Sequence, residues 1–285
     1  MRNFACGSDR LRERLAGLVW RLIEDGPAPG AWNMAVDEVL LDGVAAGTTP
    51  PTIRFYGWNP PCLSLGYFQP FDVVDVDGCR ALGVDVVRRP TGGRAILHDR
   101  ELTYSVALPA PVLGQDGGVL PSYYRLSLVL RDGLRRLGVP ATLAPESARS
   151  SAAHGPVCFD RPSAHEILLH GRKLVGSAQT RRGGGLLQHG SILIEPRIDK
   201  LMACLHRTDA AGSRGLEDRV AGLAELGVTD VGPIASAIGA AFAVGFGVDL
   251  VEAPLRPHEE EAARALARSK YQSAGWTERL VPSIA

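Results

Sequence analysis

The sequence predicts a mixed α+β domain (α/β in the broad sense) in which helices flank largely antiparallel sheets. Three observations support this: short segments of alternating apolar residues, glycine-rich turns between several of them, and segments with a helical spacing of apolar residues. The chain has 285 residues, enough for one large domain with a buried core. We expect residues 18–285 to form it, with a core of about 32–250 and residues 1–17 as an N-terminal extension.

The composition is typical of a soluble enzyme, with 45% hydrophobic and 22% charged residues. The 31 basic and 31 acidic residues cancel, which argues against a nucleic-acid partner, and no apolar run predicts a membrane span or a secretory signal. The five cysteines are widely spaced without a CxxC pair, so neither a disulfide framework nor a metal site is indicated. We therefore expect a cytoplasmic monomer without a metal and without a membrane partner.

The first elements are a strand over 18–24 and a helix that begins near Asn33, whose side chain can cap it. Asp37 and Glu38 occupy adjacent helical positions that point in different directions, so we expect solvated charges rather than a catalytic pair. The alternating segments 52–57 and 62–67 flank WNPP and predict a β-hairpin, with a core role for the Cys62 that starts its second strand.

The rest of the chain alternates between the two kinds of element. We expect strands over 84–89, 102–108, 139–143, 186–194 and 248–251, and helices over 71–82, 123–137, 196–206, 233–245 and 257–271. Residues 166–169 and 173–178 flank a His-Gly-Arg turn and predict a second hairpin.

The first chemical motif is RRPTGGRAILHDRELTYSV, which follows the strand over 84–89. Gly92 and Gly93 let the backbone turn tightly and present N–H groups, and the three cations Arg88, Arg89 and Arg94 suit an anionic ligand or an acidic partner. A purely structural turn explains TGG equally well. The His-Asp pair at His98 is more typical of a capped turn than of a catalytic dyad.

The second motif joins a thiol and a lysine. Cys158 follows a small, polar loop, and Lys173 begins the return strand of the second hairpin, close enough in sequence for the two side chains to converge. A nearby cation lowers the pKa of a thiol and so populates the nucleophilic thiolate. On the face opposite Lys173, the small residues Gly176 and Ala178 would let a ligand approach the backbone. For His165 and His189, structural hydrogen bonding is favoured over acid–base chemistry.

These motifs resemble a known family. RRPTGGRAILHDRELTYSV, CFDRPSAHEI and GRKLVGSAQTRRGGGLLQHGSIL are similar to sequences of the LipM-type octanoyltransferases, which belong to the lipoate and biotin protein ligase superfamily. GAWNMAVDEVLL, IRFYGWNPPCLSLGYFQ and SKYQSAGWTERL fit the same family, so the resemblance covers about residues 18–280. It implies the catalytic-domain fold of that superfamily.

The resemblance also implies an activity. Members move an octanoyl group from acyl carrier protein to a lysine of a lipoyl-accepting protein, the glycine cleavage H protein or an E2 lipoyl domain, in lipoate biosynthesis. Cys158 matches the family's acyl-thioester nucleophile, and Lys173 matches the lysine that lowers the thiol pKa and orients the acyl carbonyl. A thioester donor needs neither ATP nor a metal, so we expect no cofactor. The acyl pocket implied by the resemblance comprises Arg89, Thr91, Gly92, Gly93, Ser177, Ala178 and Gln179, and Arg94 and His98 beside its loop complete the candidate set.

Two other functions fit the same scaffold. An ATP-dependent lipoate ligase would leave Cys158 without a role, and the chain ends soon after KYQSAGWTERL, which leaves no room for the accessory domain of many ligases. A non-catalytic acyl- or lipoyl-binding protein would not need Cys158 and Lys173 together. The base that accepts the proton of the acceptor lysine, Lys173 or His98, stays open.

Overall fold

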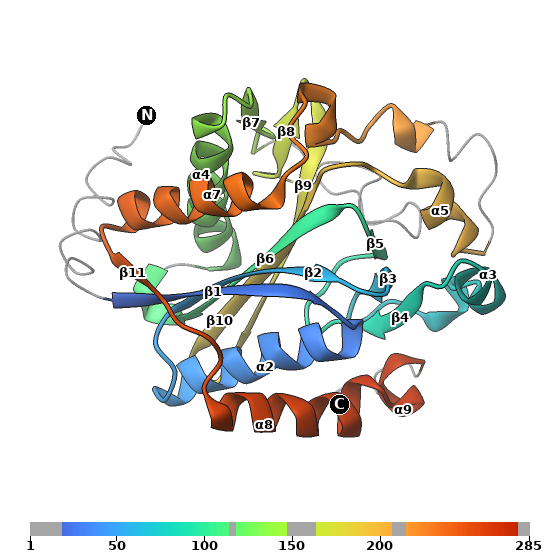
Figure 1. Cartoon of the computed structure of the whole chain (residues 1–285), viewed down its shortest axis with the longest axis horizontal. Coiled ribbons are helices and arrows are strands. Elements are labelled where there is room, and N and C mark those ends of the chain that lie inside the picture. The colour runs from blue at the N-terminus through green and yellow to red at the C-terminus, as the bar shows by residue number, and fades with distance from the viewer. Residues whose placement is uncertain (1–18, 114–117, 147–163, 207–214, 279–285) are drawn as a thin grey trace.

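A computed structural model describes residues 19–113, 118–146, 164–206 and 215–278. Its centre is an eight-stranded sheet with the order β11-β1-β2-β6-β10-β9-β8-β7 (Figure 1). β1 runs parallel to both β11 and β2, and every other neighbouring pair is antiparallel, which confirms the predicted α+β class. The strands are β1 (Val19–Ala28), β2 (Thr52–Trp58), β6 (Glu101–Pro109), β7 (Ala141–Leu143), β8 (Ile167–Leu169), β9 (Arg172–Arg182), β10 (Gly185–Leu193) and β11 (Asp249–Glu252).

A second, three-stranded sheet lies beside the end of β2, and its order is β4-β3-β5. Its strands are β3 (Cys62–Leu65), β4 (Asp85–Arg88) and β5 (Ile96–His98). The predicted hairpin over 52–67 is wrong. Both edges of β2 are already occupied, by β1 and β6, so β3 leaves the large sheet and pairs with β4 and β5 instead.

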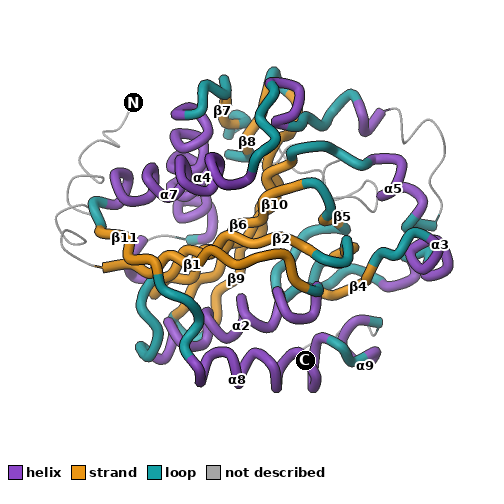
Figure 2. The backbone as a smooth tube through the Cα atoms, in the orientation of Figure 1, coloured by secondary structure: helices purple, strands orange, loops and turns teal. Residues whose placement is uncertain are grey.

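Helices cover both faces of the large sheet (Figure 2). On one face lie α2 (Gly30–Ala46), α8 (Pro257–Leu266), the π-helical turn η4 (Ala267–Tyr271) and α9 (Ala274–Thr277). On the other lie α4 (Val119–Arg136) and α7 (Val231–Phe246). The shorter helices are η1 (Phe71–Val73), α3 (Val76–Ala81), η2 (Ala110–Leu113), α5 (Ile198–Ala203) and η3 (Leu223–Leu226).

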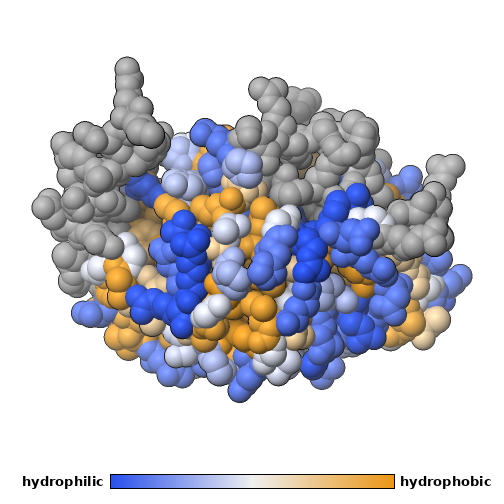
Figure 3. Space-filling model, turned by 90° about the horizontal axis from the view of Figure 1, so that it is seen from above, coloured by the Kyte–Doolittle hydropathy of each residue, from blue (hydrophilic) through white to orange (hydrophobic). Residues whose placement is uncertain are grey.

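Alternation along β2 assigns its side chains to these two faces. Phe55 packs in the core under α4 and α7, whereas Tyr56 and Trp58 pack with α2 and η4. Burial of this apolar surface from water is the main stabilising contribution to the layered arrangement. On the outer surface seen in Figure 3, hydrophobic residues lie among strips of hydrophilic ones. Among the described residues, no helix is both long and apolar enough to cross a membrane.

The second predicted hairpin is confirmed, since β8 and β9 pair on either side of residues 170–171. His170 and Gly171 have φ values of 50° and 78°, the left-handed pair that a tight two-residue hairpin turn requires. Gly183 and Gly184, at 57° and 88°, make the same kind of turn between β9 and β10. β9 therefore extends beyond the predicted strand over 173–178, and both long strands continue up to the turn.

The start of α2 differs from the prediction. The helix begins at Gly30, so Asn33 lies inside it rather than at its cap, and its side chain is fully buried. Its amide donates to the carbonyls of Ala28 and Gly57, and its oxygen accepts from Arg54. Asn33 thus joins α2 to the ends of β1 and β2, the region where the two sheets meet.

Candidate active site

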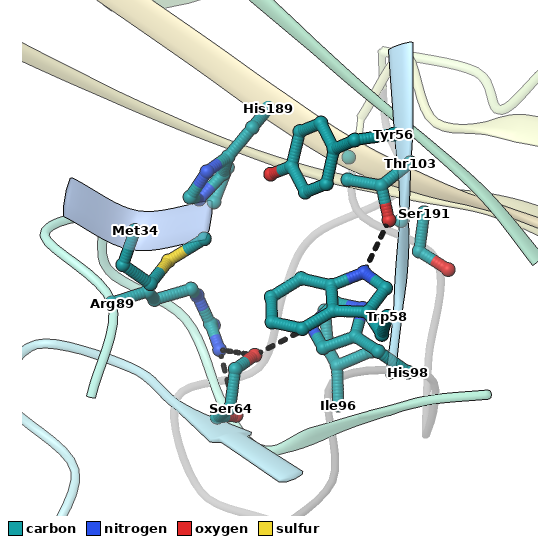
Figure 4. Close-up of a pocket in the computed structure, with 13 residues that line it drawn as sticks. Met34, Tyr56, Trp58, Ser64, Arg89, Ile96, His98, Thr103, His189 and Ser191 are labelled. Atoms are coloured by element: carbon teal, nitrogen blue, oxygen red, sulfur yellow. Dashed lines mark hydrogen bonds between the residues drawn. The ribbon is translucent and has the colours of Figure 1, made fainter. Parts of the chain in front are cut away.

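A cavity lies between the large sheet, the small sheet and α2 (Figure 4). Strands from both sheets supply most of its wall, because β2, β6, β9 and β10 meet β3 and β5 there. The residues that line it are Met34, Tyr56, Trp58, Ser64, Arg89, Ile96, His98, Thr103, Gly176, Ala178, His189, Gly190 and Ser191. Three of the predicted site residues, Arg89, His98 and Ala178, are therefore brought together in one place.

One wall of the cavity is an aromatic stack. The rings of Trp58 and His98 lie 4.0 Å apart with an interplanar angle of 11° (Figure 4). Trp58 Nε1 donates to Thr103 Oγ1 at 2.7 Å, and His98 Nε2 lies 2.8 Å from Ser64 Oγ. The apolar faces of both rings are thus fixed by hydrogen bonds at their edges.

Arg89 closes the same wall from β4's C-terminal side. Its guanidinium donates to the Ser64 carbonyl at 3.0 Å and to the Ser64 hydroxyl at 3.2 Å. It also donates to the carbonyls of Gly92 and Arg94, so it holds the TGG loop against β3. Arg89 therefore has a structural role in addition to its place on the cavity surface.

The TGG loop itself packs tightly against the loop after β3. A Cβ atom at Gly66 would lie 1.9 Å from the Gly93 carbonyl oxygen, so only glycine fits at position 66. Thr91, the first residue of the TGG loop, is buried, and its hydroxyl lies 2.7 Å from His189 Nε2. The loop is thus fastened to β10 through His189, a residue that lines the cavity.

Asp37 overturns the expectation of a solvated helix face, because its side chain is fully buried. It accepts hydrogen bonds from Tyr56 at 2.9 Å, Ser105 at 2.8 Å and His189 at 3.0 Å, and forms an ion pair with Arg54 at 3.1 Å. Burial acts to raise the pKa of Asp37, but the His189 bond and the Arg54 charge outweigh it, so the pKa is lowered.

Glu38 is also buried rather than solvated. Lys270 donates to both of its oxygens, at 2.8 and 2.7 Å, and Arg182 donates at 2.8 Å. Tyr271 donates a further hydrogen bond. Burial acts to raise the pKa of Glu38, yet the donors from Lys270, Tyr271 and Arg182 lower it overall. The two adjacent carboxylates both point into the protein because the sheet lies on one side of α2 and η4 on the other.

The buried surroundings of His189 favour its neutral form. Burial lowers the pKa of its ring, and the opposing interaction with Asp37 does not restore it. Asp37 remains charged through Arg54, so the neutral ring donates from Nδ1 to Asp37 while Nε2 faces the Thr91 hydroxyl. The predicted structural hydrogen bonding of His189 is confirmed, although the ring also lines the cavity.

The lowered pKa of His189 predicts a pH-dependent stability. Below the ordinary value of 6.5 the unfolded chain binds a proton at this residue that the folded chain does not bind, so the free energy of unfolding decreases as the pH falls through 6.5. We expect His189→Gln to have a shallower dependence between about pH 8 and 5 in urea unfolding. The matched control is His258→Gln, on the exposed His258, which should leave the slope unchanged; equal slopes in all three proteins would contradict the assignment.

Ser177 and Gln179 lie away from this cavity. The Ser177 hydroxyl bonds the Tyr104 hydroxyl at 2.7 Å, and Gln179 bonds Ser122 at 2.9 Å and Gln188 at 3.1 Å. These partners belong to the side of the sheet that α4 covers, whereas Gly176 and Ala178 line the cavity. The assignment of Ser177 and Gln179 to a substrate pocket therefore remains a prediction, and they would contribute from the α4 side.

Lys173 is buried near the start of β9, with 1% of its surface exposed. Its ammonium donates to Glu166 Oε1 at 2.7 Å. A buried ammonium needs such a partner, because removal from water costs more than an isolated charge can recover. Gly176 and Ala178 follow on the same strand, so Lys173 lies beyond one end of the strand segment that borders the cavity.

The predicted nucleophile Cys158 lies outside the described residues. Cys62, Cys79 and Cys204 are buried, as predicted for Cys62. Burial raises the pKa of the Cys62 thiol well above its ordinary value, which makes Cys62 a poor nucleophile. Among the cysteines that the structure describes, none is exposed to solvent.

Several cavity residues escaped the sequence analysis: Met34, Tyr56, Trp58, Ser64 and Ser191. A signal for two of them was present. Arg54, Tyr56 and Trp58 are every second residue of β2 and therefore lie on the same face. A strand face that combines arginine with aromatic residues is typical of a polar site with apolar walls. Met34 and Ser64 carried no such signal, because their role depends on contacts between distant elements.

Comparison with known proteins shows the family to which this chain belongs. The family model of the lipoyl protein ligase A/B catalytic domain matches residues 29–243. The chain belongs to this family. Octanoyltransferase LipM of Symbiobacterium thermophilum is 41% identical over 272 residues, which are 91% of this chain and 98% of the relative. Octanoyltransferase LipM of Geobacillus kaustophilus is 40% identical, over 92% of this chain and 99% of the relative. These relatives confirm the predicted acyltransferase class and octanoyl transfer in lipoate biosynthesis.

Solved structures of lipoate protein ligases share the fold. The bipartite lipoate protein ligase of Thermoplasma acidophilum, described with its E2 lipoyl domain, has a TM-score of 0.75 at 25% identity and covers 94% of this chain and 98% of its own. Lipoate-protein ligase A bound with ATP has a TM-score of 0.76 at 24% identity, over 94% of this chain and 100% of its own. At 24% identity, the comparison with lipoate-protein ligase A shows a shared fold and nothing further.

Proposed function

We propose that this octanoyltransferase takes its acyl group from acyl carrier protein and delivers it, in the cytoplasm, to a lysine of the glycine cleavage H protein or of an E2 lipoyl domain. The observation that carries the proposal is the 41% identity to an octanoyltransferase over nearly its whole length. The T. acidophilum ligase, described with its E2 lipoyl domain, supports a lipoyl domain as the acceptor class.

The cavity is our candidate for the octanoyl site. The paired rings of Trp58 and His98 offer an apolar wall, and Gly176 and Ala178 leave the β9 backbone open to a ligand chain. A pocket that is apolar with a few placed polar groups is the usual form of a small-molecule site. Arg89, Thr91, Gly92, Gly93 and Arg94 would border it from the TGG loop.

The first half-reaction would use Cys158 as a thiolate. The sulfur attacks the thioester carbonyl, the bond to the carrier sulfur breaks, and the carrier leaves as a thiolate while octanoyl-Cys158 forms. Lys173 supports this step in our proposal, since an ammonium near a thiol lowers its pKa. The Glu166 ion pair keeps Lys173 in a single orientation on β9, as such a role requires.

In the second half-reaction a neutral lysine amine of the acceptor attacks octanoyl-Cys158. The new amide bond replaces the thioester bond, and the proton of the amine passes to the departing Cys158 sulfur. His98 is poorly suited to act as the base, because its Nε2 and Nδ1 face Ser64 and Glu101. Lys173 is no better suited as a base while it is an ammonium paired with Glu166, so in our proposal the departing Cys158 sulfur is itself the proton acceptor.

Intact mass spectrometry after incubation with octanoyl-acyl carrier protein tests the proposal. We expect the wild-type protein to gain one octanoyl group, which is lost again when the acceptor protein is added. Cys158→Ser should show no thiol-labile adduct, while Cys79→Ala, a matched control at a buried cysteine, should still form it. No adduct on the wild type would exclude the thioester route, and turnover only with ATP and free octanoate would indicate a ligase.

A further inference from the structure

Glu101 is a buried carboxylate that the proposed reaction does not use. It is the first residue of β6, it is 6% exposed, and it does not itself line the cavity. Its oxygens accept three hydrogen bonds: from His98 Nδ1 at 2.8 Å, from Thr103 Oγ1 at 2.5 Å, and from Ser191 Oγ. Burial of a carboxylate raises the free energy of the folded state unless several donors bond to it, so these three hydrogen bonds are what allow Glu101 to be buried here.

Each of these donors lines the cavity. A fourth residue, Trp58, is linked to Glu101 through Thr103, because Thr103 Oγ1 accepts from Trp58 Nε1 and donates to Glu101. Figure 4 shows Trp58, His98, Thr103 and Ser191 together on one side of the cavity. Glu101 therefore stands behind a complete wall and is bonded, directly or through one hydroxyl, to every one of its four members.

The chain of hydrogen bonds also fixes the direction of the His98 ring. A carboxylate only accepts, so His98 Nδ1 carries a hydrogen that points to Glu101. At the other edge of the ring, Nε2 faces the hydroxyl of Ser64, which accepts from Arg89. A rotation of the ring would break the bonds at both edges, so the face that stacks on Trp58 cannot turn.

We propose that Glu101 is a positioning residue that sets the acyl-chain specificity of the enzyme. It does so by holding the Trp58–His98 wall rigid against the chain, a role that rests on the proposed octanoyl site. A rigid apolar pocket discriminates one methylene by roughly 10- to 200-fold, and the discrimination is lost when a wall can move aside. The octanoyl chain is thus selected over longer chains by a carboxylate that it never touches.

The test compares kcat/KM for hexanoyl-, octanoyl-, decanoyl- and dodecanoyl-acyl carrier protein in Glu101→Gln and Glu101→Leu. The glutamine oxygen can still accept from His98 and Thr103, so Glu101→Gln should keep the octanoyl-to-decanoyl ratio within about threefold of the wild type. Glu101→Leu removes all three acceptor bonds and should lower that ratio by about tenfold or more. Glu195→Leu, on an exposed glutamate paired with Arg100, is the matched control and should leave the ratio unchanged.

A purely structural role predicts a different result. If Glu101→Leu lowers kcat/KM equally for all four chain lengths, the proposal is overturned even if the variant is also less stable. Glu101→Asp keeps the charge but shortens the side chain, so it tests the same effect in a second variant. An octanoyl-to-decanoyl ratio that is unchanged in both Glu101→Leu and Glu101→Asp also overturns the proposal.

A measurement without chemistry separates this proposal from the proposed reaction. The ratio of dissociation constants for free octanoate and decanoate, measured by calorimetry, should fall in Glu101→Leu as the kinetic ratio does. Equal ratios in the wild type and the variant would overturn the role of Glu101, as would a wild type that binds neither acid. Failure of the thioester route alone would leave the binding ratios, and hence this prediction, intact.

Discussion

Lys173→Met should lower the rate of octanoyl transfer by about 10²- to 10³-fold, the usual cost of removing one preorganised electrostatic group from an active site. In the proposed reaction, the ammonium that lowers the pKa of the Cys158 thiol is absent from the variant. The pH profile of Cys158 alkylation by iodoacetamide should therefore move to higher pH, and steady-state transfer measures the loss of activity.

The same substitution also affects folding, and a second variant separates the two effects. Lys173→Met takes from the buried Glu166 its ion-pair partner at 2.7 Å, a change that costs about 3–5 kcal/mol in typical buried pairs. Adding Glu166→Gln removes that charge and should recover part of the stability but none of the activity. An unchanged alkylation profile, or activity restored in the double variant, would contradict the role of Lys173.

Asp37→Ala should reduce the free energy of unfolding by about 3–5 kcal/mol, as expected when one partner of a buried ion pair is removed. The substitution leaves the buried Arg54 without this carboxylate and takes an acceptor from Tyr56 and Ser105. Urea unfolding measures the change. The pKa of Asp37 is lowered, so its stabilising contribution is present above the ordinary value of 3.8 and is lost as the pH falls below it.

Asp42→Ala is the matched control for Asp37→Ala on the same helix. Asp42 pairs with Arg182, and its side chain is 57% exposed, so its removal should cost no more than about 1 kcal/mol. Similar losses at the two positions would mean that the Asp37 network is not an important source of stability.

The sequence predicted the strands and helices well and their pairing less well. The hairpin of β8 and β9 followed from a local turn signal, and such a signal depends only on neighbouring residues. The segments over 52–57 and 62–67 gave an equally clear alternation, but their partners β1, β6, β4 and β5 are distant in sequence. Alternation identifies a strand and does not identify its neighbour.

The prediction that the charged residues of α2 are solvated was wrong for the same reason, because their partners are distant in sequence. Asp37 and Glu38 look like solvated helix charges until Arg54, His189 and Lys270 are in place around them. Arg89, His98 and Ala178 could be assigned to a site from motifs, and all three line the cavity. The wall that Trp58 forms with His98 could not be predicted from the sequence, because β2 and β5 belong to different sheets.

Arg88 ties α9, the last helix that the structure describes, to the candidate site. Its fully buried guanidinium donates to the carbonyls of Gly66, Tyr67 and Gln69 after β3, and to those of Trp276 and Thr277 in α9. A fragment that stops after β11, near the predicted core limit of 250, would expose these donors and the loop beneath the TGG turn. The shortest recombinant version worth preparing for ligand soaking or binding studies should therefore extend through Thr277.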